Sequence, residues 1–222
     1  MWEHDDEPET VVDHVGRLLL REKRADPVTL VGRGVLLLLL LLWTVSLGTS
    51  SIGSNKVAES FLHVINLVFH EAGHILFMPF GGFMMSLGGS LTQVLIPLAL
   101  MVVFLTKHRD PFGAAATWWW AGENLLDLAP YIDDARALQL VLLGGHTGAE
   151  VEGHDWERIL TSLGWLHLDH TLARLAHAAG VMIMLSALVW GVVLVAAHWQ
   201  RSRSASAAGA HADDGATWRE PR

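Results

Sequence analysis

The sequence predicts an all-α polytopic membrane protein, a bundle of about four to five transmembrane helices joined by short loops. Of its 222 residues, 51% are hydrophobic and only 17% are charged. The apolar residues form long blocks rather than the amphipathic stripes of a soluble core. Ten tryptophans against one tyrosine fit the aromatic belts that membrane proteins place at the water interface. Segments that cross lipid must be helical, because isolated strands leave their backbone unsatisfied there.

The chain before the first apolar block is polar. Apolar residues at helical spacing between Val11 and Leu20 predict a short surface helix within a cytoplasmic N-terminal segment, residues 1–27. The acidic opening and the late start of the apolar block do not match a secretory signal. Basic residues before the first span place the N-terminus in the cytoplasm. These residues are Arg17, Arg21, Lys23, Arg24 and Arg33.

Five apolar segments follow, and each reaches the roughly 20 residues that a crossing requires. They cover about residues 34–52, 57–80, 87–106, 112–138 and 171–199. They define a transmembrane domain, residues 28–200, followed by a tail, residues 201–222, whose composition predicts disorder. Five full crossings would put Arg201 and Arg203 outside the cytoplasm. Either one segment does not cross fully, the polar fourth being the favoured exception, or this weaker C-terminal bias is overridden.

Composition limits the partners and the chemistry. The formal net charge of -8 argues against nucleic acid as a partner. The expected surroundings are a lipid bilayer, with a bacterial inner membrane as the expected location. The chain has no cysteine, which excludes disulfides and thiolate metal sites. Any metal must therefore be held by His, Asp or Glu.

The second apolar segment carries the strongest functional motif, His70-Glu71-Ala72-Gly73-His74. On a helix His70 and His74 lie on one face, so two imidazoles can hold one ion. Glu71 can then take a proton from water at that ion. Such a pattern also occurs by chance, but ionisable residues inside a membrane segment are costly and usually functional. We expect one zinc ion here, although His and carboxylate ligands also suit Mn, Fe, Co or Ni.

Two further residues share the face of the motif. Asn66 lies on the face of His70 and His74, and His63 lies one turn earlier. His63 is expected beside the metal rather than on it. Gly73 removes bulk next to the ligands and lets another helix approach.

A catalytic zinc site takes three protein ligands and keeps a fourth position for water. The fourth apolar segment offers Asn124, Asp127, Tyr131 and Asp134, whose spacing draws one polar stripe down a helix. Asp134 is the favoured third ligand and Asp127 the runner-up, while Asp133 lies off the stripe. The alternative is that the stripe is a solvated or helix-packing face.

A second candidate pair follows Gly153. His154 and Asp155 can cap the site or contribute a ligand. The alternative interpretation is a simple helix N-terminus with Asp155 as its cap. Further along, His167, His170 and His177 are interpreted as interfacial histidines rather than as a second metal site.

Over about residues 61–136 the sequence resembles the site-2 protease type of intramembrane zinc metalloprotease. Three motifs carry the resemblance. They are His70-Glu71-Ala72-Gly73-His74; Pro79-Phe80-Gly81-Gly82 with Gly88-Gly89-Ser90-Leu91-Thr92-Gln93; and Asn124-Leu125-Leu126 with Pro130 and Asp133-Asp134-Ala135-Arg136. The last is similar to the family's Asn-Leu-Leu, proline, Leu-Asp-Gly stretch, whose aspartate is the third zinc ligand. This chain has no Leu-Asp-Gly, and the family register would choose Asp133 where the helical stripe chooses Asp134.

The resemblance implies hydrolysis of peptide bonds in or beside the bilayer by an intramembrane zinc metallopeptidase. Glu71 would be the general base, and Asn124 would contact the substrate backbone or the developing oxyanion. The substrate would be a membrane protein or transmembrane peptide whose helix has locally unwound. One rival is a non-proteolytic metal-binding subunit with a structural, sensing or assembly role in a larger membrane complex. A weaker rival is an ion transporter, since buried Asp and His can line a cation path.

Overall fold

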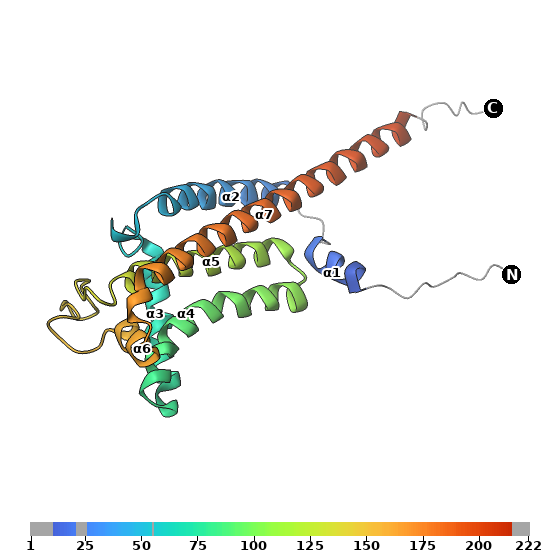
Figure 1. Cartoon of the computed structure of the whole chain (residues 1–222). Coiled ribbons are helices and arrows are strands. Elements are labelled where there is room, and N and C mark those ends of the chain that lie inside the picture. Colours follow the sequence, from blue (N-terminus) through green and yellow to red (C-terminus); the bar gives the residue numbers. More distant parts are fainter. Residues whose placement is uncertain (1–10, 21–25, 55, 215–222) are drawn as a thin grey trace, which may run out of the picture.

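The all-α bundle expected from the sequence is confirmed in the computed structural model, which describes residues 11–20, 26–54 and 56–214. Within these ranges the regular structure is helical and contains no strand. The helices, shown in Figure 1, are α1 (Val11–Leu20), α2 (Pro27–Gly48), α3 (Phe61–Phe77), α4 (Gly82–Val103), α5 (Pro111–Asp133), α6 (Asp155–Leu163) and α7 (Asp169–Asp214).

Local sequence signals set where several helices begin. Asp26 caps α2 by accepting hydrogen bonds from the backbone N–H groups of the first turn, and Pro27 occupies the first helical position. Ser60 caps α3 in the same way. Asp110 and Pro111 repeat the α2 arrangement at the start of α5. Each side chain satisfies backbone donors that would otherwise lack a partner at the helix end.

In the part of the chain that the structure describes, four helical stretches are long and apolar enough to cross a membrane, so the chain is an integral membrane protein. They are Pro27–Gly48, Phe61–Phe80, Gly82–His108 and Leu166–Arg203. The polar helix α5 is not among them, and most of its residues are buried. Its polar side chains are therefore enclosed by neighbouring helices instead of facing lipid, which explains how a helix of this composition is accommodated.

Glycines allow two close helix contacts that position the interior. α5 packs most extensively on α7, where a Cβ atom at Gly180 would lie 2.5 Å from the carbonyl oxygen of Gly122. α3 packs on α4, where a Cβ atom at Gly73 would collide with the carbonyl oxygen of Gly88. Figure 1 shows α2, α4, α5 and α7 running along one general direction, with α3 crossing them near the end where α6 lies.

The last helix differs from expectation. Residues 201–222 were expected to be a disordered tail; α7 continues to Asp214, and residues 215–222 lie outside the described residues. Alanine recurs through this extension, and alanine has the highest helix propensity, so the helix can continue past its packed part.

Candidate metal centre

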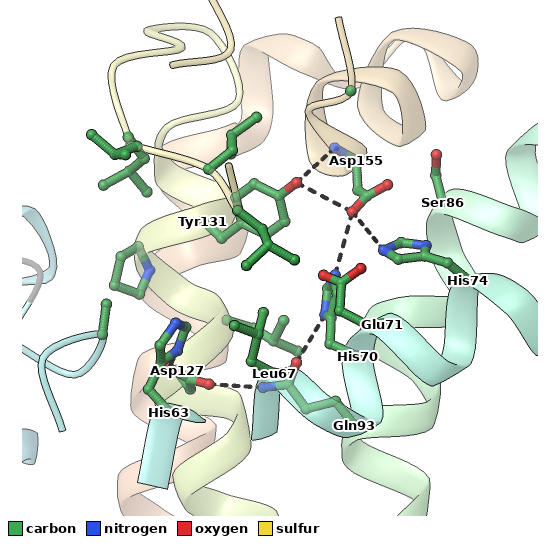
Figure 2. Close-up of a pocket in the computed structure, with 18 of the residues that line it drawn as sticks. His63, Leu67, His70, Glu71, His74, Ser86, Gln93, Asp127, Tyr131 and Asp155 are labelled. Atoms are coloured by element: carbon green, nitrogen blue, oxygen red, sulfur yellow. Dashed lines mark hydrogen bonds and ion pairs between the residues drawn. The ribbon is translucent and has the colours of Figure 1, made fainter. Parts of the chain in front are cut away.

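Helix α3 places His70 and His74 on one face, as the spacing predicts. Their ring centroids lie 4.8 Å apart, and His70 is buried while His74 is partly buried. Together with Glu71 they form a group whose ligand-type atoms all lie within 4.8 Å of one another. Figure 2 shows the three side chains directed to the same side of α3. The motif is therefore assembled in three dimensions as a possible metal-binding group.

The carboxylate that meets both histidines comes from Asp155, the first residue of α6. Its Oδ2 atom lies 3.3 Å from His70 Nε2 and 3.2 Å from His74 Nε2. A tetrahedral zinc ion with bonds of about 2.0–2.2 Å holds its ligand atoms roughly 3.3 Å apart. The observed separations therefore suit the edges of a zinc tetrahedron. Two imidazoles and one carboxylate also form a common ligand set of catalytic zinc sites, so these residues fit the ion.

Tyr131 of α5 holds Asp155 in place. The backbone N–H of Asp155 donates to the tyrosine oxygen at 2.9 Å, and the tyrosine hydroxyl donates to Asp155 Oδ2 at 3.2 Å. Burial raises the pKa of Asp155, but hydrogen bonds from His70 and His74 outweigh it and hold the pKa below its ordinary value. Asp155 is thus presented as a carboxylate, the form that binds metal.

The start of α6 is set by the residue before Asp155. The Nδ1 atom of His154 accepts a hydrogen bond from the backbone N–H of Glu157 at 3.1 Å. Burial lowers the pKa of His154, against the opposing effect of the Asp134 carboxylate. A neutral imidazole can accept at Nδ1, so His154 is the N-cap and Asp155 is the first helical residue. The helix thus begins one residue earlier than the interpretation with Asp155 as the cap.

Helix α4 forms the other wall of the centre. A Cβ atom at Gly89 would lie 2.6 Å from His70 Nε2 and 2.7 Å from His74 Nε2. The missing side chain therefore leaves the space that an ion between these nitrogens needs. The carbonyl oxygen of Met85 lies 2.8 Å from His74 Nδ1, and Gln93 Oε1 lies 3.0 Å from His70 Nδ1. Both outer nitrogens thus face acceptors, an arrangement typical of metal-binding histidines.

The structure does not bring Asp134, the favoured third ligand, to the histidines. Its two carboxylate oxygens accept the backbone N–H groups of Gln139 and Leu140, both at 2.9 Å. Helix α5 ends at Asp133, so the polar stripe stops before Asp134 and the side chain turns to the following loop instead. Asp133, the choice of the family register, pairs with His170 of α7 at 2.6 Å. Asp155 takes the place that the stripe reserved for Asp134.

The other predicted residues lie near the centre or away from it. Asp127 lines the cavity but bonds to His63 Nδ1 at 2.8 Å, so it reaches His70 only through Gln93. His63 lies beside the centre, as expected. Asn124 is fully buried, donates to the carbonyl of Trp120 and does not line the cavity. This placement does not suit the substrate contact that the resemblance implied for it.

Sequence reasoning missed Gly89, Gln93 and the Met85 carbonyl as parts of the centre. The Gly-Gly run and the amide inside α4 were visible as a motif. Their roles depend on how closely α3 and α4 approach each other, and a single sequence does not report this distance.

A cavity of about 650 Å³ opens onto the centre. One wall holds His70, Glu71 and His74, and Tyr131 and Asp155 stand opposite (Figure 2). Apolar side chains complete it. They include Leu67, Leu128, Leu140, Val141, Leu142, Leu143 and Val151. The cavity combines a polar centre with an apolar lining, as sites for peptides or small ligands do.

The fold and the centre define the class only as a polytopic helical membrane protein with a possible His–Glu–His metal-binding group. No protein-family model, no curated protein and no solved structure matches the chain.

Proposed function

We propose that this protein is a membrane-embedded zinc metalloprotease that cleaves peptide bonds in or near transmembrane segments. One observation carries the proposal. The Nε2 atoms of His70 and His74 converge on Asp155 Oδ2 at 3.3 and 3.2 Å, with Glu71 beside them in the lining of the cavity. The resemblance of the Glu71 motif and its neighbours to site-2 type proteases supports the same activity.

In this proposal each residue of the centre has a separate task. His70, His74 and Asp155 would hold the zinc ion, which would lower the pKa of a bound water to about 7 and polarise a carbonyl. Glu71 accepts the proton of the attacking water and then passes it to the leaving amine. Tyr131 keeps Asp155 oriented through its two hydrogen bonds. The apolar loop side chains at Leu140 to Leu143 restrict water and contact an unwound substrate segment.

The decisive comparison is wild type beside Glu71→Gln. Both proteins are reconstituted with membrane protein extract, and new N-termini are identified by mass spectrometry. We expect about one zinc per chain in both proteins, and new termini within transmembrane segments only with wild type. Cleavage by the Gln variant at the same sites and rate would contradict the role of Glu71.

A second function is a non-proteolytic metal-binding subunit. The observation that favours it is the position of Glu71, whose carboxylate belongs to the group within 4.8 Å. If Glu71 binds the ion, the shell closes with four protein ligands, as in structural zinc sites. Zinc affinity separates the two functions. Glu71→Gln retains zinc if Glu71 is the base, and loses affinity strongly if it is a ligand.

A further inference from the structure

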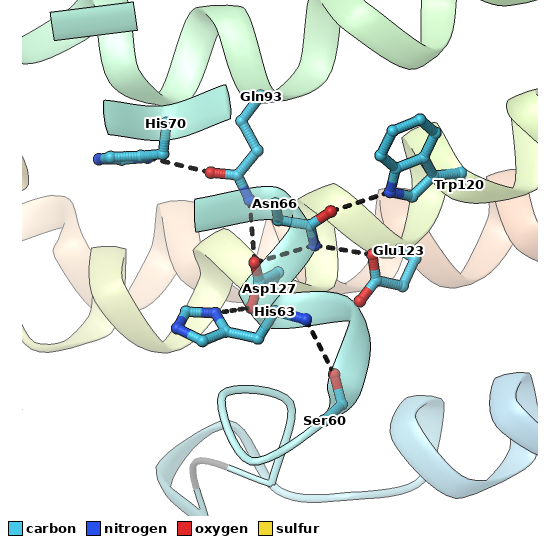
Figure 3. Close-up of polar contacts among 8 residues, drawn as sticks. All are labelled: Ser60, His63, Asn66, His70, Gln93, Trp120, Glu123 and Asp127. Carbon is cyan, nitrogen blue, oxygen red and sulfur yellow. Dashed lines mark hydrogen bonds and ion pairs between the residues drawn. The ribbon is translucent and has the colours of Figure 1, made fainter. Parts of the chain in front are cut away.

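A chain of hydrogen bonds crosses the buried interior from the indole of Trp120 to the imidazole of His70 (Figure 3). It runs through Asn66 of α3, Asp127 of α5 and Gln93 of α4, so it joins three helices. Asn66 is fully buried, and Gln93 is 3% exposed. Polar groups so deeply buried are costly unless they are paired. Here the donor and the acceptor of each hydrogen bond can be assigned.

The assignment of donors and acceptors starts at Trp120. An indole N–H only donates, so the amide of Asn66 must present its oxygen to it, at 2.8 Å. The NH₂ group of Asn66 then faces carboxylate oxygens, Asp127 Oδ2 at 3.0 Å and Glu123 Oε2 at 2.9 Å. Both are acceptors, so the orientation of Asn66 is consistent on all sides.

Asp127 determines the orientation of the amide that it contacts in α4. Its Oδ2 accepts from Asn66, and its Oδ1 is held by His63 Nδ1 at 2.8 Å. Gln93 must therefore turn its NH₂ group to Asp127 Oδ2, at 2.9 Å. The amide oxygen of Gln93 is left facing His70 Nδ1, at 3.0 Å.

The amide oxygen only accepts, so His70 must carry a hydrogen on Nδ1. With an ion bound, the ring is neutral and its lone pair is on Nε2, where the ion would replace the hydrogen that Nε2 shares with Asp155 Oδ2. His74 does not need this chain, because its Nδ1 faces the backbone carbonyl of Met85.

We propose that Asp127 and Gln93 are positioning residues that hold His70 in the Nδ1–H tautomer and so present its Nε2 lone pair to zinc. The inference rests on the metal-binding part of the proposed function and does not depend on proteolysis. Residues that orient a metal-binding histidine in this way commonly change metal affinity by about 10- to 100-fold when lost.

Zinc affinity of the full-length protein in detergent, measured by chelator competition, tests the chain. Gln93→Met removes the acceptor at similar length, and Asp127→Leu frees the amide of Gln93. Both are expected to bind zinc about 10- to 100-fold more weakly. Asp127→Asn keeps an oxygen that accepts from Gln93 and is expected to recover most of the affinity. Glu123→Gln is the matched control, because Glu123 bonds to Asn66 and not to Gln93.

A spectroscopic readout separates positioning from general stability. In ¹⁵N NMR of the zinc-loaded wild type, His70 is expected to show a protonated Nδ1 that exchanges slowly with water. In Gln93→Met this hydrogen is expected to exchange faster. The wild-type spectrum needs no variant to fold, and a His70 ring bound through Nδ1 would overturn the inference.

The outcomes also separate this inference from the proposed function. Wild-type zinc affinity in Gln93→Met, with unchanged exchange at Nδ1, overturns the positioning role alone. Proteolysis that fails while the affinity pattern holds overturns the protease alone. Wild type that binds no zinc overturns both.

Discussion

At the scale of single residues, Asp155 and Asp134 make the sharpest contrast. Asp155 contacts both histidines, whereas Asp134 holds two backbone N–H groups of the loop after α5. We predict that Asp155→Ala weakens zinc binding by more than about 100-fold, beyond the usual loss for an outer partner. Asp134→Ala is expected to keep stoichiometric zinc. Metal analysis of the purified variants, beside His70→Ala, measures this, and zinc loss only in Asp134→Ala would contradict it.

A second prediction at this scale concerns the hydroxyl of Tyr131. Tyr131→Phe removes both hydrogen bonds to Asp155 and keeps the ring. We expect about a 10-fold loss of zinc affinity, because the carboxylate loses its support, and a loss of stability of about 1 kcal/mol. Chelator competition and thermal unfolding measure the two effects. An unchanged affinity would show that α6 alone orients Asp155.

At the scale of helices, glycines separate the stability of the bundle from the metal centre. A Cβ atom at Gly73 collides with the backbone of α4, whereas one at Gly89 meets the His70 and His74 rings. We predict that Gly73→Ala destabilises the fold by about 1–3 kcal/mol through overpacking. Gly89→Ala is expected to reduce zinc affinity with a smaller effect on unfolding.

The control for this pair lies in α2. A Cβ atom at Gly32 would meet nothing within 4 Å, so Gly32→Ala is expected to leave zinc binding unchanged and to alter stability only through helix propensity. Thermal unfolding and zinc titration of the three variants are compared in one detergent. If Gly73→Ala and Gly89→Ala behave alike in both measurements, the two contacts do not have the separate roles assigned here.

The polarity of α5 also belongs to this scale. Glu123, Asn124 and Asp127 are buried because α5 lies between its neighbours, and the NH₂ groups that donate to its carboxyl oxygens come from α3 and α4. The polar stripe was expected to supply a metal ligand. Instead, its side chains hold residues of the candidate metal centre in position. Asp127 and Tyr131 of that stripe do face the cavity.

At the scale of the whole molecule, both described ends leave the bundle at the same side. Figure 1 shows α1 and the end of α7 extending from one end and the α5–α6 loop at the other. Basic residues occur in the first turns of α2 (Arg33) and in the last part of α7 (Arg201 and Arg203), and basic residues prefer the cytoplasmic side of a membrane. An arrangement with both ends on one side removes the conflict that five full crossings would create.

We therefore predict a cytoplasmic C-terminus as well as a cytoplasmic N-terminus. A green fluorescent protein fused after Arg222 is expected to fluoresce, and alkaline phosphatase inserted after the exposed Gly144 is expected to be active. Phosphatase activity at the C-terminus together with none at Gly144 would reverse the orientation.

Structural features that depend only on residues close together in the chain can be predicted from the amino-acid sequence. Long apolar blocks predict the membrane helices, whereas the capping residues Asp26, Ser60 and Asp110 were identified in the structure. The spacing of His70 and His74 predicts a shared face, because helix geometry relates residues one turn apart.

Which carboxylate contacts both histidines is decided only by the packing of the helices. Asp155 is 85 residues from His70 in the chain, and no periodicity connects a residue of α3 to the start of α6, because two other helices lie between them. The glycine contact between α3 and α4, the end of α5 at Asp133 and the hold of Tyr131 on α6 bring it there. Helical repeats set directions within one element, whereas distances between elements follow from close packing and loop geometry, and a metal centre needs those distances.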